Sequence, residues 1–197
     1  MKVANFSDLD LTKEYTVADY LTWWFEERVE LIKGKIHPLI PTPRDIHQEV
    51  SINLSTEINS RLKKHPCAAR HAPYDVFLPI VNKKGEPHTV VQPDLVVICD
   101  LDKIKTDGCH GAPDLVVEIL SPGTSKKDTN EKFDLYEETG VKEYWIVHPS
   151  EQTFQVYVLV EGSYQLKGRF FGRGDHLEST AVDGLVLDLN EVFEETR

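Results

Sequence analysis

The sequence predicts an α/β or α+β domain in which a mixed central β-sheet carries a helix on each face. Two observations predict this class: the apolar pattern changes from a helical to an extended period after Pro66, and a further helical segment separates two of the later strands. The length of 197 residues, with 40% hydrophobic and 28% charged side chains, is an ordinary balance for a compact domain. We therefore expect a single domain over residues 1–197.

Three segments have the signals of helices. The first is expected over about residues 16–26, because Thr16 is a good N-cap and apolar residues follow it at helical spacing. The second is expected from about Asp45 to Lys64, where a capping residue precedes an i, i+4 row of apolar side chains. The third runs from Ser125 to Thr139 and ends at Gly140, a residue typical of helix C-termini.

Extended segments rich in Val, Ile and aromatic residues supply the sheet. The first, Glu30 to Ile40, is interrupted by a turn at residues 33–35. The later ones are Tyr74 to Val81, Asp94 to Cys99, Asp114 to Leu120, Glu143 to His148 and Phe154 to Val160. The core of the domain is therefore expected over about residues 29–160, with C-terminal strands in residues 161–197.

Charge and composition narrow the possible functions. Lys and Arg total 22 against 33 Asp and Glu, giving a net charge of −11, so any contact with nucleic acid needs a local basic strip and a bound cation. The three cysteines, odd in number and without a CxxC pair, argue against a disulfide framework and a zinc ribbon. No secretory signal or membrane-length apolar segment is evident, so we expect a cytoplasmic protein without membrane association.

Glu118 lies in the middle of a strand whose other residues are apolar on both faces. A carboxylate in such a place costs several kcal/mol unless a cation, a metal or a proton compensates it. The alternatives are that Glu118 pairs with a structural arginine or faces a solvated sheet edge.

Asp94 and Lys132 are two more polar residues in apolar surroundings. Asp94 begins the strand expected beside that of Glu118, although an Asp after a proline is also common in turns. Lys132 falls between Leu135 and Tyr136 in the apolar stripe of the third helix, where a lysine can also extend outward to solvent. Two acids and a lysine around a divalent cation would form a site able to hydrolyse phosphodiesters.

These residues belong to a longer series of motifs. In order, the chain contains Glu30-Leu-Ile-Lys-Gly-Lys-Ile, His47-Gln48, Gln92-Pro93-Asp94-Leu-Val-Val, Pro113-Asp-Leu-Val-Val-Glu118-Ile-Leu-Ser-Pro-Gly-Thr124, and Lys132 through Gly140-Val-Lys-Glu-Tyr-Trp-Ile-Val. The series resembles the Uma-two restriction-endonuclease-like family of the PD-(D/E)XK nuclease superfamily, from about Tyr15 to the C-terminus. The resemblance implies a restriction-endonuclease-like core and a nuclease that depends on Mg²⁺ or Mn²⁺.

The resemblance also implies the metal ligands. Asp94 and Glu118 would be the metal-binding acids, and the backbone carbonyl of Ile119 would be a further ligand. The usual lysine of the superfamily lies two residues after the glutamate, where this chain has Leu120. Lys132 would supply a relocated ammonium group from the following helix.

Three further residues are implied near the site. Glu30 resembles the acid of the first element that assists the metal in some members of the superfamily. His47 and Gln92 are expected to contact the substrate, although a satisfied, half-buried structural role fits His47 as well.

DNA is the expected substrate, and a homodimer is possible because restriction-type nucleases often dimerise to cut both strands. The alternative class is a catalytically inactive nuclease-fold module that binds nucleic acid or a protein partner, favoured by the net charge of −11 and by Leu120. A paired-carboxylate glycosidase is a third option, which would need no metal.

Overall fold

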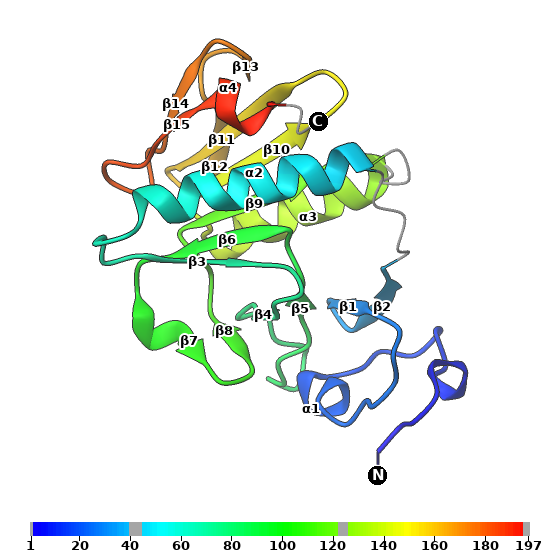
Figure 1. Cartoon of the computed structure of the whole chain (residues 1–197). Helices are drawn as coiled ribbons and strands as arrows, with labels where there is room; N and C mark the ends of the chain where they lie inside the picture. Colours follow the sequence, from blue (N-terminus) through cyan, green and yellow to red (C-terminus); the bar gives the residue numbers. More distant parts are fainter. Residues whose placement is uncertain (1, 40–44, 122–125, 195–197) are drawn as a thin grey trace.

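The computed structural model describes residues 2–39, 45–121 and 126–194, with the side chains of residues 126–129 left aside. Within these residues the chain forms a seven-stranded central sheet, a six-stranded smaller sheet and a two-stranded hairpin (Figure 1). In Figure 1 the smaller sheet lies below the central one, next to the N-terminal segment. None of the described helices is both long and apolar enough to cross a membrane.

The central sheet has the strand order β12-β11-β10-β9-β6-β3, with β13 paired to β11. Its strands are β3 (Ala68–His71), β6 (Leu95–Ile98), β9 (Leu115–Ile119), β10 (Glu143–His148), β11 (Thr153–Val160), β12 (Ser163–Leu166) and β13 (Phe171–Gly172). Only β9 and β10 run parallel among these pairs. Parallel neighbours need a crossover connection, and here it contains helix α3 (Lys126–Thr139).

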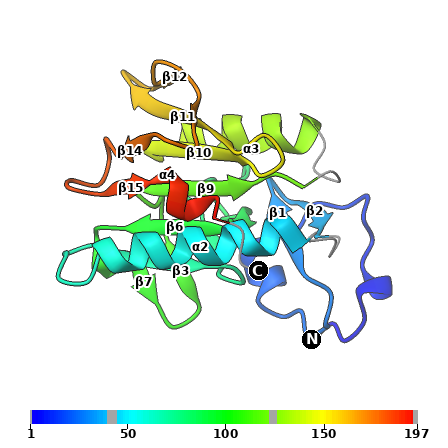
Figure 2. The same ribbon diagram turned by 45° about the horizontal axis from the view of Figure 1, so that its top comes forward.

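The two long helices cover opposite faces of the central sheet, as Figure 2 shows. Strand alternation sends Val117 and Trp145 to the core under α2 (Asp45–Arg61), whereas Val116 and Tyr144 face α3. The inner strands are apolar on both faces because both faces are covered. The predicted mixed sheet with a helix on each face is thus confirmed.

The smaller sheet has the order β2-β1-β5-β4-β8-β7. Its strands are β1 (Val29–Ile32), β2 (Lys35–Pro38), β4 (Val76–Phe77), β5 (Val90–Val91), β7 (Ile104–Lys105) and β8 (Gly108–His110). The strand expected over residues 74–81 is therefore only two residues long. A short 3₁₀ turn, Leu101–Lys103, precedes β7. The end of the strand predicted to reach Ile40 lies outside the described residues.

The first helix is much shorter than predicted. α1 spans only Val17–Tyr20, and the helix predicted over about residues 16–26 is wrong beyond its first turn. After Tyr20 the backbone bonds to Val3 near the N-terminus and does not continue the helix. Val3 N donates to Thr22 O at 3.2 Å, and Trp24 N donates to Val3 O at 2.7 Å. Thr16 and Asp19 do form a capping box at the start of the helix, but the pairing with Val3 ends the helix after one turn.

The C-terminal segment, predicted to contain strands, also contains a short helix. After β12 and β13 the chain forms the hairpin of β14 (His176–Glu178) and β15 (Val186–Asp188), and then a short helix, α4 (Leu189–Val192). The apolar residues of this segment complete the core beneath α2.

The expectation of no disulfide is wrong. Cys67 and Cys99 form a disulfide across the neighbouring strands β3 and β6, and Cys109 is a buried free cysteine. In the antiparallel register Ala68 faces Ile98, so the two cysteines flank this pair from directly opposite positions. Their separation of 32 residues gave no local motif from which the pairing could be read.

Glu143 is a fully buried carboxylate that attaches the C-terminal hairpin to β10. Its Oε1 accepts a hydrogen bond from Trp145 Nε1 at 2.9 Å. Its Oε2 accepts from Ser179 Oγ at 2.6 Å and from the backbone N–H groups of Thr180 and Ala181, both at 2.8 Å. Four donors thus replace water around one charge, and the segment that precedes β15 is held against the central sheet.

We predict that Glu143→Gln lowers the free energy of unfolding by about 2 kcal/mol or more, because an amide NH₂ would face one of the donors and the charge-assisted bonds would be lost. The measurement is chemical denaturation. Glu151→Gln is the control, since the Glu151 side chain is 67% exposed and should change stability by less than about 0.5 kcal/mol. Equal effects of the two substitutions would contradict the role of Glu143.

Candidate active site

Asp94 and Glu118 lie at facing positions of neighbouring strands. In the antiparallel pair β6–β9, Leu95 faces Val117, so the same register places Asp94 opposite Glu118. Directly opposite residues of such strands point to one face, with Cβ atoms about 4.5–5.5 Å apart. That face is the one covered by α3, because Val96 and Val116 pack against it. The predicted convergence of the two acids agrees with this register.

Lys132 of α3 joins Glu118 to Glu30 of the smaller sheet. Its Nζ lies 2.8 Å from Glu118 Oε1 and 2.8 Å from Glu30 Oε1. Glu30 is 2% exposed and the Lys132 side chain 13% exposed, so both charges are largely removed from water. The ammonium compensates the mid-strand carboxylate, and neither a structural arginine nor a solvated edge is involved.

Tyr136, one helical turn after Lys132, gives Glu118 a second donor. Its hydroxyl donates to Glu118 Oε1 at 2.7 Å, and its side chain is fully buried. Burial and the charge of Glu118 raise the pKa of Tyr136 well above its ordinary value, so the hydroxyl keeps its proton. Both donors from the described residues go to Oε1, which leaves Glu118 Oε2 for another partner.

The charges of this cluster influence one another. Burial raises the pKa of Glu118 to about 7; Lys132 opposes the shift, and the charges of Asp94 and Glu30 add to it. Burial by itself would lower the pKa of Lys132, but the carboxylates of Glu118 and Glu30 raise it above its ordinary value. Lys132 is therefore charged, and a further positive charge beside Glu118 would favour the ionised form of Glu118.

His47, near the start of α2, reaches the cluster from the other side of the sheet. Its Nε2 lies 3.6 Å from Asp94 Oδ1, while Asp94 Oδ2 accepts a hydrogen bond from Ile119 N at 2.7 Å. Hydrogen bonding to Asp94 raises the pKa of His47, burial opposes this, and the Ile119 backbone and Glu118 contribute further in the raising direction. His47 Nδ1 is buried and has no hydrogen-bond partner among the described residues.

Gln92 is close to the cluster by its backbone only. Its N–H donates to Glu30 Oε1 at 2.8 Å, but its side chain points away and binds Arg28, Asp75 and, at 3.4 Å, Tyr20. The structure thus brings together Asp94, Glu118, Lys132, Glu30, His47 and the Ile119 backbone, and directs the Gln92 side chain elsewhere.

The donor set fits a hard divalent cation. Asp94 and Glu118 offer carboxylate oxygens on one face, and the buried Nδ1 of His47 marks a polar position that a bound group could satisfy. Among the described residues no three His, Cys, Asp or Glu side chains gather closely enough to hold a metal by themselves. Mg²⁺ commonly binds through one or two carboxylates and keeps several water molecules, so two side-chain ligands suit it.

Sequence reasoning missed the hydrogen bond from Tyr136 to Glu118. Tyr136 entered the prediction only as an apolar marker of the stripe on the third helix. The available signal was its i+4 spacing from Lys132, which puts both side chains on the same helix face. A hydroxyl beside a buried ammonium on that face is suited to bind a shared carboxylate.

The chain resembles known proteins over nearly its whole length. A solved structure from Anabaena variabilis, described as a putative nuclease belonging to DUF820, matches with a TM-score of 0.69 and 21% identity, covering 91% of this chain and 97% of that one. A curated relative from Synechocystis sp., described as uncharacterized, is 29% identical over 142 residues, 71% of each chain.

The fold is therefore a mixed α+β fold shared with that solved structure. The family model described as "Uma2: Putative restriction endonuclease" matches residues 17–190. The chain belongs to this family, as the motifs in the sequence indicated, and family membership supports a nuclease-like role.

We predict that Lys132→Met lowers the free energy of unfolding by about 3–5 kcal/mol at pH 8, because two buried carboxylates lose their shared counterion. The loss should shrink toward pH 5. Without the ammonium the pKa of Glu118 in the folded protein rises further above its unfolded value, so stability is present at low pH and falls as the pH rises through the folded value.

Denaturant unfolding between pH 5 and pH 8 measures this prediction. The control is Lys35→Met, which removes a lysine whose side chain is 47% exposed and lies 3.9 Å from Glu14; it should have only a small effect at either pH. A Lys132→Met variant whose stability loss did not depend on pH would contradict the assigned charge coupling.

Proposed function

We propose that this protein is a divalent-metal-dependent endonuclease that hydrolyses phosphodiester bonds of DNA, with Mg²⁺ or Mn²⁺ as cofactor. The observation that carries the proposal is the Lys132 ammonium, 2.8 Å from both Glu118 and Glu30, on the sheet face that Asp94 shares. Membership of a family described as restriction endonucleases supports the same reaction class. Possible homodimerisation and a cytoplasmic location stay predictions from the sequence.

Each residue has a part that follows from its contacts. Asp94 and Glu118, with the Ile119 carbonyl, would hold the metal, which when bound supplies a polarised phosphate and a water of lowered pKa. Lys132 and Tyr136 hold Glu118 Oε1, so that Oε2 is presented to the site. Glu30 keeps the Lys132 ammonium charged and in place, and that charge stabilises negative charge developing on the phosphate. His47, whose Nε2 lies 3.6 Å from Asp94 Oδ1, would contact substrate or water.

One observation favours the second candidate, a nuclease-fold module that binds nucleic acid or a protein partner without cutting. The position two residues after Glu118 holds Leu120, partly buried against the α3-side core, and the ammonium comes from Lys132 instead. A lysine fully occupied by two carboxylates could serve the fold alone. The two candidates differ in a direct measurement, which is metal-dependent cleavage. The third option from the sequence, a paired-carboxylate glycosidase, needs no metal and would stay active in EDTA.

We predict that Mg²⁺ or Mn²⁺ raises the melting temperature of the protein, because the metal binds only the folded arrangement of two carboxylates. At a metal concentration a hundredfold above Kd, the gain in the free energy of unfolding is about 2.7 kcal/mol. Asp94→Asn should fold, because an amide oxygen can still accept from Ile119 N, and should lose most of the gain.

The control is Asp134→Asn, which removes an exposed carboxylate from α3 and should leave the metal response unchanged. Differential scanning fluorimetry with titrated metal gives the comparison. If Asp94→Asn responded to metal like the wild type, the binding would belong to surface carboxylates.

We predict that Lys132→Met lowers metal-dependent DNA cleavage by roughly 10²–10⁴ and that adding Leu120→Lys restores part of it. Leu120 shares strand parity with Glu118, so a lysine there would bring the charge back to the same face from the strand. The measurement is cleavage of single- and double-stranded DNA by wild type, both single variants and the double variant, at a temperature where all are folded. Full activity of Lys132→Met, or metal binding by a wild type that cuts neither DNA, would refute the proposed nuclease mechanism.

A further inference from the structure

Arg28 lies directly before β1, on the strand that supplies Glu30. Leu39 N donates to Arg28 O at 2.9 Å, so the antiparallel pairing of β1 and β2 continues to Arg28. Arg28 precedes Glu30 by two residues, and its guanidinium turns to the Gln92 side chain. Glu30 points into the buried cluster, and Arg28, two residues earlier, is exposed to solvent.

The neighbouring strand places Arg28 near Asp94 as well. In the antiparallel pair β1–β5, Leu31 faces Val90, and this register continued by three residues brings Arg28 opposite Pro93. Pro93 directly precedes Asp94. Gln92 links Arg28 to the acid cluster, because its N–H donates to Glu30 Oε1 at 2.8 Å while its side-chain oxygen accepts from Arg28 Nε.

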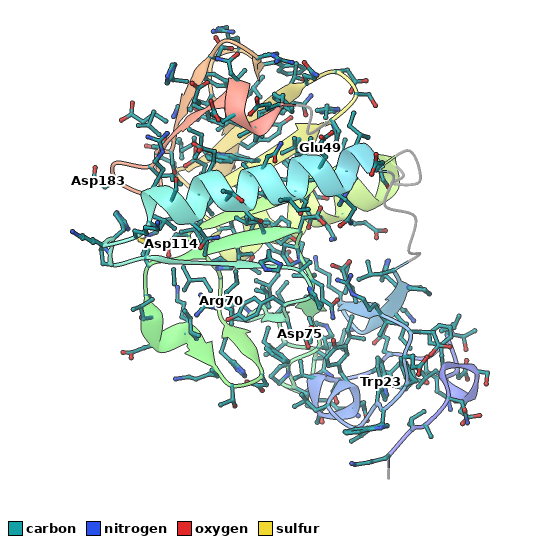
Figure 3. All side chains as sticks on the ribbon, in the orientation of Figure 1. Trp23, Glu49, Arg70, Asp75, Asp114 and Asp183 are labelled. Atoms are coloured by element: carbon teal, nitrogen blue, oxygen red, sulfur yellow. A yellow bond between two sulfur atoms is a disulfide. The ribbon has the colours of Figure 1, made fainter. Side chains whose placement is uncertain are left out.

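Gln92 holds the Arg28 side chain in place. Arg28 Nε donates to Gln92 Oε1 at 2.9 Å. The other end of the amide, Nε2, donates to Asp75 Oδ1 at 2.7 Å, and Tyr20 donates to Asp75 Oδ2 at 3.0 Å. Figure 3 shows Asp75 at the smaller sheet, on the side of the segment that carries Trp23. The carboxylate fixes which way the amide points, and the amide oxygen then orients the guanidinium.

The charge of Arg28 differs from those of its neighbours in how it is compensated. Lys33 lies 2.8 Å from Glu138, Lys35 lies 3.9 Å from Glu14, and His37 lies 3.9 Å from Glu131. Arg28 instead binds a neutral amide, and among the described residues its two terminal NH₂ groups have no hydrogen-bond partner. Within the part of the chain that the structure describes, the exposed guanidinium thus keeps its terminal donors open to a ligand from solvent.

The acid cluster needs such a cation if it is to receive a phosphodiester. Asp94, Glu118 and Glu30 share the buried ammonium of Lys132, so carboxylates outnumber it. We propose that Arg28, oriented by Gln92, binds a backbone phosphate of the nucleic acid beside the cleaved bond. This inference rests on the proposed function and deepens it. Gln92 then acts through Arg28 as a positioning residue, and does not touch the substrate.

The geometry of an arginine fits this task. A guanidinium presents parallel N–H groups that match two oxygens of one phosphate, whereas a lysine is a point charge. Phosphate contacts of this kind are independent of base sequence and set the position of the nucleic acid in the site. The competing explanation is that Arg28 only compensates the partly buried Asp75, whose pKa is raised by burial and lowered in part by Arg28.

The experiment compares Arg28→Gln with Lys84→Gln, which removes one positive charge from an exposed turn of the same part of the chain. Duplex DNA binding is measured without metal at several salt concentrations, and kcat and KM are measured with Mg²⁺. We expect Arg28→Gln to weaken binding about tenfold and to reduce the slope of log K against log salt by about 0.9, as for one lost phosphate contact. KM should rise more than kcat falls, and Lys84→Gln should behave as wild type.

Two further variants test the geometry. Arg28→Lys should keep the salt slope and lose part of the affinity, because the charge stays and the paired donors go. Gln92→Met should weaken binding less than Arg28→Gln and should add nothing when both changes are combined, since Gln92 acts only through Arg28. Additive effects of the two changes would overturn this relation.

The outcomes separate the inference from the proposed function. If wild type cuts DNA and Arg28→Gln binds and cuts it equally well, the phosphate contact is overturned and the nuclease stands. If binding depends on Arg28 but no metal supports cleavage, the contact stands and the protein is a binding module. If Arg28→Gln only lowers the melting temperature, with unchanged DNA affinity, Arg28 serves Asp75 and the inference is overturned.

Discussion

The structure depends on one buried interaction, the Lys132 ammonium between two carboxylates that come from different sheets. Glu118 belongs to the central sheet and Glu30 to the smaller one, so the ammonium attaches the two sheets to each other and to α3. Burying one of these carboxylates without a counterion would cost several kcal/mol, and burying the pair would cost more. The apolar layers on either side can close around the cluster because the ammonium compensates part of its negative charge. The same arrangement leaves an excess of negative charge, which favours a cation at Asp94 and Glu118.

The location of this cluster could be predicted because each member violates a local pattern. Glu118 interrupts an apolar strand, Asp94 begins the facing strand, and Lys132 lies in an apolar helix stripe. Such violations can be recognised in the sequence alone, and a buried charge implies a partner even before the partner is known. The direction in which a side chain such as that of Gln92 points could not be predicted. The amide of Gln92 turns toward Asp75 and Arg28, although its backbone touches Glu30, and no periodicity decides between these directions.

Errors in the predicted fold have a common cause, which is pairing between segments distant in sequence. The helix predicted over residues 16–26 has a good N-cap, yet Val3 pairs with the segment after Tyr20 and ends it. Cys67 and Cys99 are neighbours only through the register of β3 and β6. Local signals therefore predicted the start of a helix better than its end. Contacts between residues distant in sequence could not be predicted without the strand register.

The packing of α2 has a consequence for the order in which the protein can be built during synthesis. This helix carries His47 near its first turn, but part of the core beneath it comes from residues 177–193, and Asn53 Nδ2 donates to Glu194 O at 2.9 Å. More than a hundred residues must be added after α2 before those partners exist. Until then the helix lacks part of its apolar cover. The core beneath α2 therefore cannot close fully until translation has passed residue 194.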